Sequence, residues 1–226
     1  MDALYISGLG PPQILVNNQK VEIKRRKAVA LLVYLAVEGR SQSREFLSGL
    51  FWPEYEQSRA YAYLRRTLWE IKDVLGGGLL EVSREWVSIP SSPSFQMDVN
   101  QFQALLRAVK DHDHPFSEPC DQCIDRFEVA IRLYRGDFLS GFSLSACPQF
   151  DDWQFLQSEI IRRTFRESLQ NLVNALEQRS RISEAIPYAQ RWLAIDSLDE
   201  RAHRKLMALF AQNGQINAAL RQFERC

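Results

Sequence analysis

An internal period of 34 residues near the C-terminus restricts the fold of this chain more than any other feature of its sequence. At this offset apolar residues fall on apolar residues: Leu176 on Phe210, Ile182 on Ile216, Ala185 on Ala219 and Ile186 on Leu220. A period of this length is typical of stacked helix pairs, because one pair cannot bury its apolar face alone. Small alanines suit the points where helices cross, since close packing leaves no room for larger side chains. The sequence therefore predicts an all-α repeat array in this part.

The 34-residue period is also the length of a tetratricopeptide (TPR) repeat, and helical patterns continue upstream of it. Apolar residues recur at helical spacing from residue 98 onward. We expect helices over about 98–110, 122–134, 150–178, 182–195, 199–213 and from 215 onward. The sequence ends at Cys226 within a helical pattern that has no C-terminal cap. We therefore expect the repeat domain to be truncated at this residue, with further chain beyond it.

The first 90 residues have a different order of elements. Short runs rich in Ile, Leu and Val, with Asn17-Asn18 at a turn, predict three short strands. Helices are expected over 27–39, 43–52 and 56–75, ended by Gly39, Pro53 and Gly76-Gly77-Gly78, and a β-hairpin over 79–90 with its turn at 83–85. Ser41 or Ser43 is the expected N-cap of the second helix. This order predicts a winged helix-turn-helix preceded by a small sheet.

The helix expected over 56–75 has an apolar side and an arginine-bearing side. At about 100° per residue, five apolar residues fall within about 40° of one line, namely Ala60, Leu64, Leu68, Ile71 and Leu75. The opposite side carries Arg59, Ala62, Arg66, Trp69 and Asp73. Because the apolar line must face the core, the arginines must face solvent or a partner.

A domain boundary is predicted at PSSPSFQ, residues 90–96, which holds two prolines and three serines. We expect a winged-helix domain over residues 1–97 and a TPR-like helical domain over residues 98–226. The fold class is therefore mainly α with a small β part: a winged helix-turn-helix with an N-terminal β-sheet and a C-terminal hairpin, followed by an all-α repeat domain.

Composition excludes several classes of protein. No run of about 18 apolar residues could cross a membrane, and the N-terminus lacks the features of a signal peptide, so we expect a cytoplasmic protein. Four unevenly spaced cysteines are too few for a disulfide scaffold in a chain of 226 residues. The formal net charge is zero, yet eleven basic and six acidic residues lie between Lys20 and Lys72. This local excess is compatible with phosphate contacts.

Catalytic motifs are missing from the sequence. It contains no phosphate-binding glycine loop, no GxSxG elbow, no HExxH and no set of kinase motifs. The glycines of GLGPP and GGG are not followed by the residues that such loops require. We expect neither an enzyme nor a bound cofactor.

Several segments, in a fixed order, resemble a known family: VEIKRRKAVALLVYLA, SREFLSGLFWPE, AYAYLRRTLWEIKDVLG, DVNQF, LYRGDFLSGF and DDWQFLQSE. On these segments the chain resembles the SARP-type bacterial transcription activators over nearly its whole length. In that family an OmpR/PhoB-type winged helix precedes a bacterial transcriptional activator domain (BTAD). The resemblance implies binding to double-stranded DNA as a homodimer on repeated half-sites, and contact with RNA polymerase or a sensor domain. Tyr63, Trp69 and Glu70 depart from the more basic recognition helix of the family.

The arginine-bearing side of the third helix supplies the candidate DNA contacts. Arg66 lies at its centre and is expected to read a base, since a guanidinium can pair bidentately with guanine. Arg59 and Arg65 flank it and are expected to hold phosphates, which fix the register without reading sequence. Tyr63 and Trp69 are expected to pack on a sugar or a thymine methyl group. The alternative is a solvated helix face with snorkelling arginines.

Further contacts are expected from the neighbouring elements. Ser43 and Arg44, at the start of the second helix, are placed to meet the DNA backbone, because a helix N-terminus favours phosphate. Arg84 at the hairpin turn is expected to enter or straddle the minor groove, with an exposed turn residue as the alternative. The basic run at residues 25–27 suits a phosphate contact and a solvated turn equally well.

A possible metal-binding pattern consists of His112, His114, Cys120 and Cys123. Four such side chains can hold zinc, but a strong zinc signature repeats its CxxC pair. We favour surface histidines and small buried thiols, and therefore no metal.

The sequence thus predicts a transcription regulator, an activator, that reads duplex DNA with the helix at 56–75. Two alternatives remain open. One is a protein-interaction adaptor whose winged helix does not bind DNA, although an adaptor would not need Arg59, Arg65 and Arg66 together on its surface. The other is a zinc-dependent enzyme built on the His/Cys pattern.

Overall fold

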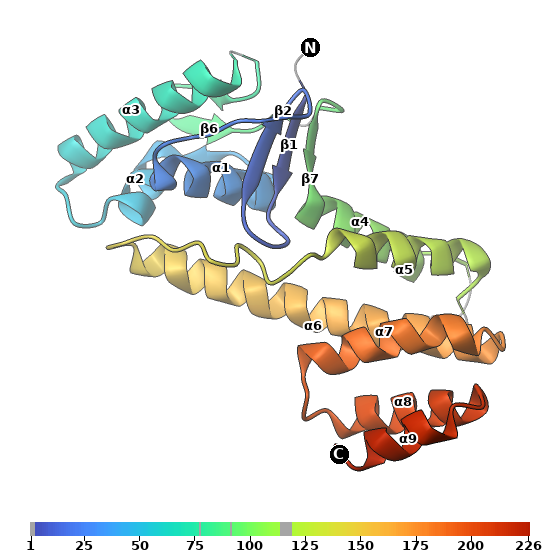
Figure 1. Cartoon of the computed structure of the whole chain (residues 1–226). Coiled ribbons are helices and arrows are strands. Elements are labelled where there is room, and N and C mark those ends of the chain that lie inside the picture. The colour runs from blue at the N-terminus through green and yellow to red at the C-terminus, as the bar shows by residue number, and fades with distance from the viewer. Residues whose placement is uncertain (1–2, 77, 91, 114–118) are drawn as a thin grey trace. The chain divides into compact units, whose positions relative to one another are not determined.

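The computed structural model describes residues 3–76, 78–90, 92–113 and 119–226. The chain forms two compact units, the first made of residues 1–101 and 134–161 and the second of residues 102–133 and 162–226. Both units draw on separate stretches of the chain, because helices α4 (Asp98–Lys110) and α6 (Pro148–Gln178) each begin in the first unit and end in the second (Figure 1).

A four-stranded sheet of order β3-β2-β1-β7 forms part of the first unit. Its strands are β1 (Leu4–Ser7), β2 (Gln13–Val16), β3 (Gln19–Lys20) and β7 (Phe95–Met97). Asn17 and Asn18 join β2 to β3 with φ angles of 51° and 62°, which is the conformation that a tight hairpin turn requires. β7 pairs in parallel with β1, and this strand overlaps the stretch at 90–96 where the sequence predicted a domain boundary.

Three helices and a wing complete the winged-helix order: α1 (Arg26–Glu38), α2 (Arg44–Phe51), α3 (Gln57–Leu75), and a small sheet of order β4-β6-β5. Gly39 ends α1 with a φ of 62°, and the Ser43 side chain caps α2 by accepting a hydrogen bond from the Phe46 N–H at 3.1 Å. The wing is the hairpin of β5 (Glu81–Val82) and β6 (Trp86–Ser88). Strand β4 (Gln42–Ser43) was not predicted, because two residues are too short to show a period.

Residues 134–161 belong to the first unit, whereas the sequence predicted them in the second domain. The Arg135 N–H donates to the Leu9 carbonyl at 3.2 Å, and the Leu139 N–H donates to the Gly8 carbonyl at 2.9 Å. These bonds join the segment to the chain that follows β1. The compact units therefore divide the chain differently from the predicted ranges 1–97 and 98–226.

All regular secondary structure in the described residues of the second unit is helical. It contains the ends of α4 and α6 together with α5 (Asp121–Leu133), α7 (Ile182–Ile195), α8 (Glu200–Gln212) and α9 (Ile216–Phe223). α7 packs against α8, and α8 packs against α9. None of the helices in the described part of the chain is long and apolar enough to cross a membrane.

The 34-residue period is present in the backbone as well as in the side chains. Ser180 and Gly214 occupy equivalent positions and both have positive φ angles, 59° and 74°. The residue after each donates its N–H to an equivalent carbonyl, Arg181 to Leu176 at 2.9 Å and Gln215 to Phe210 at 2.8 Å. Both turns then lead into a helix, at Ile182 and at Ile216. The predicted TPR-like repeat is confirmed at the level of its turns.

Candidate nucleic-acid interface

Helix α3 buries one side and exposes the other, as its sequence predicts. Its buried residues are Ala60, Leu64, Thr67, Leu68, Ile71 and Leu75. The exposed residues include Arg59, Ala62, Arg65, Arg66 and Trp69. The apolar line therefore anchors α3 in the first unit and leaves the arginine-bearing side accessible.

Arg65 and Arg66 are the most available cations of this helix. Within the described part of the chain, neither guanidinium takes part in a hydrogen bond or an ion pair. Trp69, one turn further along, is 67% exposed, which is unusual for so large an apolar side chain. Two unpaired guanidinium groups beside an exposed indole form a surface that can bind phosphates, base edges or aromatic rings.

Two tyrosines hold Arg59 in place near the start of α3. Its guanidinium carbon lies 4.7 Å from the ring centre of Tyr55 and 5.8 Å from that of Tyr63. One of its nitrogens donates to the Tyr63 hydroxyl at 3.5 Å. This hydrogen bond is the main reason why the pKa of Tyr63 is lowered, and a hydrogen bond with Tyr55 adds to the effect. Contacts within the protein thus already position Arg59.

Tyr63, which was predicted to pack on a sugar or a thymine methyl group, already has ring partners within the protein. The residue is half-buried, and its ring stacks on Trp52 with an interplanar angle of 12° and packs against Tyr55. The ring is thus already engaged within the protein, where it supports Arg59. Glu70, whose negative charge is unfavourable near DNA, forms an ion pair with Arg25 at 2.8 Å.

The start of α2 supplies both predicted residues, but each has a structural role as well. The Ser43 hydroxyl caps the helix. Arg44 donates from one guanidinium nitrogen to the Ser83 carbonyl at 3.2 Å. The backbone N–H of Arg44 donates to the Glu85 carbonyl at 2.8 Å. Arg44 therefore ties α2 to the turn of the wing, a contact that the sequence did not indicate.

The wing presents Arg84 at its tip. Arg84 is exposed, and the turn around it is fixed by the Ser83 hydroxyl, which accepts hydrogen bonds from Glu85 and Trp86. Trp86 is 50% exposed and was missed as a candidate. Its neighbour Val87 is fully buried, and alternation along a strand then turns Trp86 outward. The sequence alone does not show which of Trp86 and Val87 faces the core, and Trp86 was missed for this reason.

The basic run at residues 25–27 is engaged within the first unit. Arg26 donates to the Ser143 carbonyl at 3.0 Å, and Lys27 pairs with Glu54 at 3.4 Å. With Arg25 bound to Glu70, every member of the run has a protein partner. The same residues line a hollow of about 310 Å³ together with Trp52, Tyr63, Thr67, Leu144 and Ser145. The run thus makes contacts within the protein, although Arg26 is still exposed.

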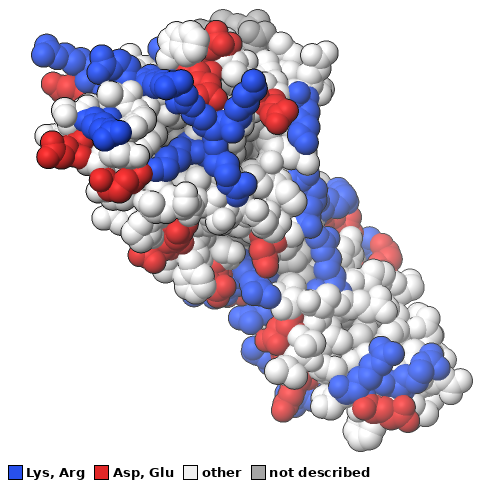
Figure 2. All heavy atoms as spheres, turned by 60° about the vertical axis from the view of Figure 1, so that its left-hand side comes forward, with Lys and Arg blue, Asp and Glu red and all other residues white. Residues whose placement is uncertain are grey.

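Basic side chains gather on the face that the α3 side of the molecule presents (Figure 2). Lys and Arg form a branching band across the upper part of this view, with Asp and Glu mainly around its margins. A molecule with no formal net charge thus carries a concentrated positive region. Such a region attracts a polyanion locally without making the whole protein basic.

Three of the four residues in the possible metal-binding pattern lie close together. His112, Cys120 and Cys123 come together, with their ligating atoms within 4.8 Å of one another. His114, the fourth residue of the pattern, lies outside the described residues. Cys120 and Cys123 are not joined in a disulfide; Cys123 is buried and Cys120 is half-buried.

The chain thus combines a winged helix-turn-helix, whose third helix exposes arginines, with a set of helical repeats. The family model of the bacterial transcriptional activator domain (BTAD) matches residues 97–226. The chain therefore belongs to the BTAD family, a family of transcription regulators. The description of this family is one of transcriptional activation, not of an enzymatic activity.

A solved structure has the same fold over the whole chain. It is Mycobacterium tuberculosis EmbR in complex with a low-affinity phosphopeptide, with a TM-score of 0.71 and 18% sequence identity. The match covers 100% of this chain and 59% of the EmbR chain. No curated protein gives a significant match. The family match does not reach the winged helix, so its OmpR/PhoB-type assignment stays a prediction.

Proposed function

We propose that this chain activates transcription by reading duplex DNA with α3 in the major groove. The observation that carries the proposal is the pair of exposed arginines, Arg65 and Arg66, which have no hydrogen bond or ion pair in the described part of the chain. An unpaired guanidinium group can bind a phosphate or a guanine without a free-energy cost for breaking an internal contact first. An adaptor has no need for such a surface on the helix that winged-helix proteins use for reading.

The roles of the arginines follow from their positions and partners. Arg66 is central and unconstrained, so it reads a base edge. Arg65 holds a phosphate, and Arg59 holds another from its tyrosine-bound position at the start of α3. Arg84 reaches the minor groove or its phosphates from the wing tip, and Trp69 and Trp86 pack against sugars or thymine methyl groups. The hydroxyl of Ser43 and the remaining donors of Arg44 approach the backbone at the start of α2.

The repeat domain is the surface for proteins. Stacked helix pairs present an extended face, and this face serves self-association, contact with RNA polymerase or docking of a sensor domain. We propose a homodimer on repeated half-sites, working in the cytoplasm where the chromosome lies. No cofactor is needed for this activity.

Selection of duplexes from a random pool, followed by fluorescence anisotropy with the selected sequence, tests the proposal. We expect the full chain to select a repeated motif. Arg66→Ala should cost about 1 to 3 kcal/mol and relax one base preference, whereas Arg59→Ala should weaken binding to all sequences alike. Arg204→Ala is the matched control, since Arg204 is an exposed helical arginine of the second unit.

Two outcomes would count against this function. Failure of the folded chain to bind any duplex at low salt would favour the adaptor. Equal, sequence-independent losses for Arg66→Ala and Arg59→Ala would leave DNA binding intact as a conclusion but remove the division of roles.

A further inference from the structure

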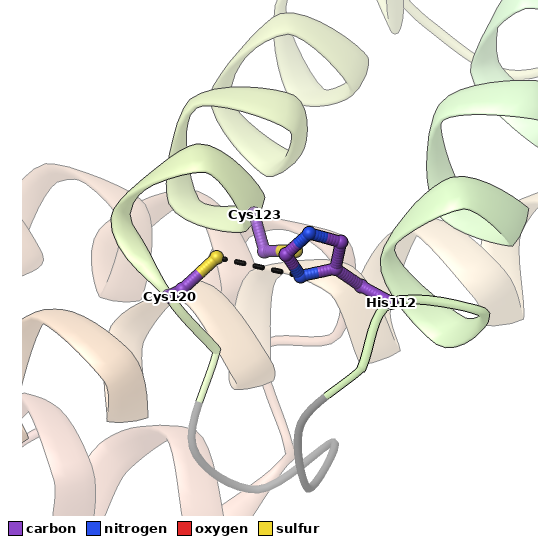
Figure 3. Close-up of side chains that lie close together, drawn as sticks. All are labelled: His112, Cys120 and Cys123. Atoms are coloured by element: carbon purple, nitrogen blue, oxygen red, sulfur yellow. Dashed lines mark hydrogen bonds between the residues drawn. The ribbon is translucent and has the colours of Figure 1, made fainter.

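Three potential metal ligands converge where α4 ends and α5 begins (Figure 3). His112 lies in the turn after α4, Cys120 directly precedes α5, and Cys123 lies in the first turn of α5. All three belong to the second unit, so their arrangement does not depend on how the two units are placed. DNA binding by α3 does not use them.

The distances between these side chains fit a tetrahedral zinc site. With Zn–S bonds of about 2.3 Å and Zn–N bonds of about 2.0 to 2.1 Å, a ligating sulfur and nitrogen lie about 3.6 Å apart and two sulfurs about 3.8 Å apart. The Sγ of Cys120 lies 3.5 Å from Nδ1 of His112 (Figure 3). Every other separation among the three atoms is at most 4.8 Å, so a closure of about 1 Å or less, within reach of side-chain rotation, completes the geometry.

The backbone fixes the spacing of the two thiols. The N–H groups of Cys123 and Ile124 both donate to the Cys120 carbonyl at 3.0 Å, which forms the first turn of α5. A CxxC pair in such a turn is the common two-sulfur half of a structural zinc site, and a histidine from a neighbouring segment is a usual third ligand. Cys123 is buried while His112 and Cys120 are half-buried, so one side of the site stays open to a fourth ligand.

The charges around the site also suit a zinc ion. Two thiolates neutralise the charge of Zn²⁺, and imidazole binds it in its neutral form. Arg126 donates from one guanidinium nitrogen to the Ala108 carbonyl at 3.0 Å and lies 3.8 Å from Sγ of Cys123. The Arg126 guanidinium would face no net positive charge at the site, because a zinc ion and its two thiolates are together neutral.

We propose that His112, Cys120 and Cys123 bind one Zn²⁺ ion in a structural site that clips the end of α4 to the start of α5. The fourth position of the tetrahedron is filled by water or by another donor. A dithiol that only forms a disulfide would not require His112, and the convergence of the histidine on both thiols is what favours the metal. Because the three ligands come together only in the folded chain, the ion stabilises the second unit.

Zinc content of the full chain tests this site directly. The reduced protein is stripped with a chelator, reloaded with zinc, freed of excess metal and analysed by elemental mass spectrometry. We expect about one zinc per chain for the wild type and for Cys226→Ser, whose cysteine is exposed and far in sequence from the site. Cys120→Ser and His112→Ala should each lower the affinity for zinc at least about tenfold. Circular dichroism of each variant establishes that it remains folded.

Two further measurements separate the site from non-specific binding by thiols. Cobalt in place of zinc should give thiolate-to-metal absorption and the visible bands of tetrahedral Co²⁺ in the wild type and not in Cys120→Ser. Zinc should raise the melting temperature of the wild type by several degrees and leave that of Cys120→Ser unchanged.

Clear results would overturn the site. Less than about 0.1 zinc per reloaded wild-type chain would exclude it, since a structural site is close to fully occupied under these conditions. Equal zinc content in the wild type and in folded Cys120→Ser would place the ion elsewhere. A quantitative Cys120–Cys123 disulfide, formed by a reduced chain that holds no zinc, would assign the pair to dithiol chemistry instead.

Discussion

A single carboxylate, that of Asp98, joins three segments of the first unit. Asp98 is 1% exposed and accepts hydrogen bonds from the Ser7 hydroxyl at 2.8 Å, the Gly8 N–H at 2.8 Å and the Leu9 N–H at 3.0 Å. Arg135, from the segment that the sequence placed in the other domain, approaches it at 3.5 Å. The sequence predicted only that Asp98 begins a helix. The residue pattern at a helix start carries no information about distant groups that donate hydrogen bonds to this carboxylate.

Replacing Asp98 with alanine should destabilise the first unit strongly. The change leaves the buried donors of Ser7, Gly8 and Leu9 without their acceptor, and each unsatisfied group costs about 1 to 3 kcal/mol. We expect the free energy of unfolding to fall by about 3 kcal/mol or more, measured by urea denaturation of the full chain. Asp152→Ala, at an exposed position, is the control and should change it by less than about 0.5 kcal/mol. Similar values for both variants would show that the Asp98 network contributes little.

At the scale of elements, the turns of the repeat depend on backbone conformation more than on side-chain packing. Gly214 has a φ of 74°, and a Cβ at this position would meet no atom within 4 Å. Gly49, in α2, also has open space around a Cβ but has no positive φ. The two glycines therefore separate the effect of conformation from that of space.

The substitutions Gly214→Ala and Gly49→Ala should have opposite effects. An alanine in the left-handed region costs about 1 kcal/mol, whereas an alanine in place of a helical glycine gains about 0.5 to 1 kcal/mol. Thermal and urea unfolding of both variants measure the difference. A loss of stability in Gly49→Ala would mean that α2 is constrained by something other than its helical propensity.

Asp199 makes the start of α8 sensitive to acid. Burial by itself raises the pKa of this carboxyl, but hydrogen bonds from the Trp192 indole at 3.0 Å and from the N–H groups of Arg201 and Ala202 outweigh it, so that the pKa is lowered from 3.8. A lowered pKa in the folded state means that the stabilisation is present above pH 3.8 and disappears as the pH falls through the folded value.

Asp199→Asn should therefore be less stable than the wild type at neutral pH, by about 1 kcal/mol, because it loses a charged helix cap. The difference should shrink as the pH falls below 3.8 and through the lowered pKa of the folded state, because the wild-type carboxyl then becomes protonated. Urea unfolding of both proteins at neutral and acid pH measures this. A difference that stays constant with pH would mean that charge is not what Asp199 contributes.

For the whole molecule, net charge is a poor guide to DNA binding. The formal net charge is zero, yet the DNA binding proposed above would be governed by the few cations on one face that can meet phosphates. The acidic residues elsewhere, which balance the charge, would limit such binding to that face. Salt dependence should then report the number of phosphate contacts and not the overall charge.

Salt titrations of DNA binding should show this with the full chain. We expect the logarithm of the association constant to fall linearly with the logarithm of salt concentration. Arg65→Ala should reduce the slope by about one, because it removes one phosphate contact, and Arg204→Ala should leave it unchanged. An unchanged slope in Arg65→Ala would mean that this guanidinium does not contact a phosphate.

Local patterns were sufficient to predict the helices, the two sides of α3, the wing and the repeat. Each depends on the spacing of apolar residues or on the chemistry of a turn, as at Gly39 and Asn17-Asn18, and both are written within a few neighbouring residues. The 34-residue period is likewise visible because one unit has the same packing needs as the next.

Only the tertiary structure decided which distant segments meet. It placed β7 beside β1, residues 134–161 in the first unit, and His112 beside Cys120 and Cys123. It also decided which arginines are already bound, as Arg44 is to the wing, and which remain available, as Arg66 does. These outcomes depend on contacts between residues far apart in the chain, and the local spacing of residues does not indicate such contacts.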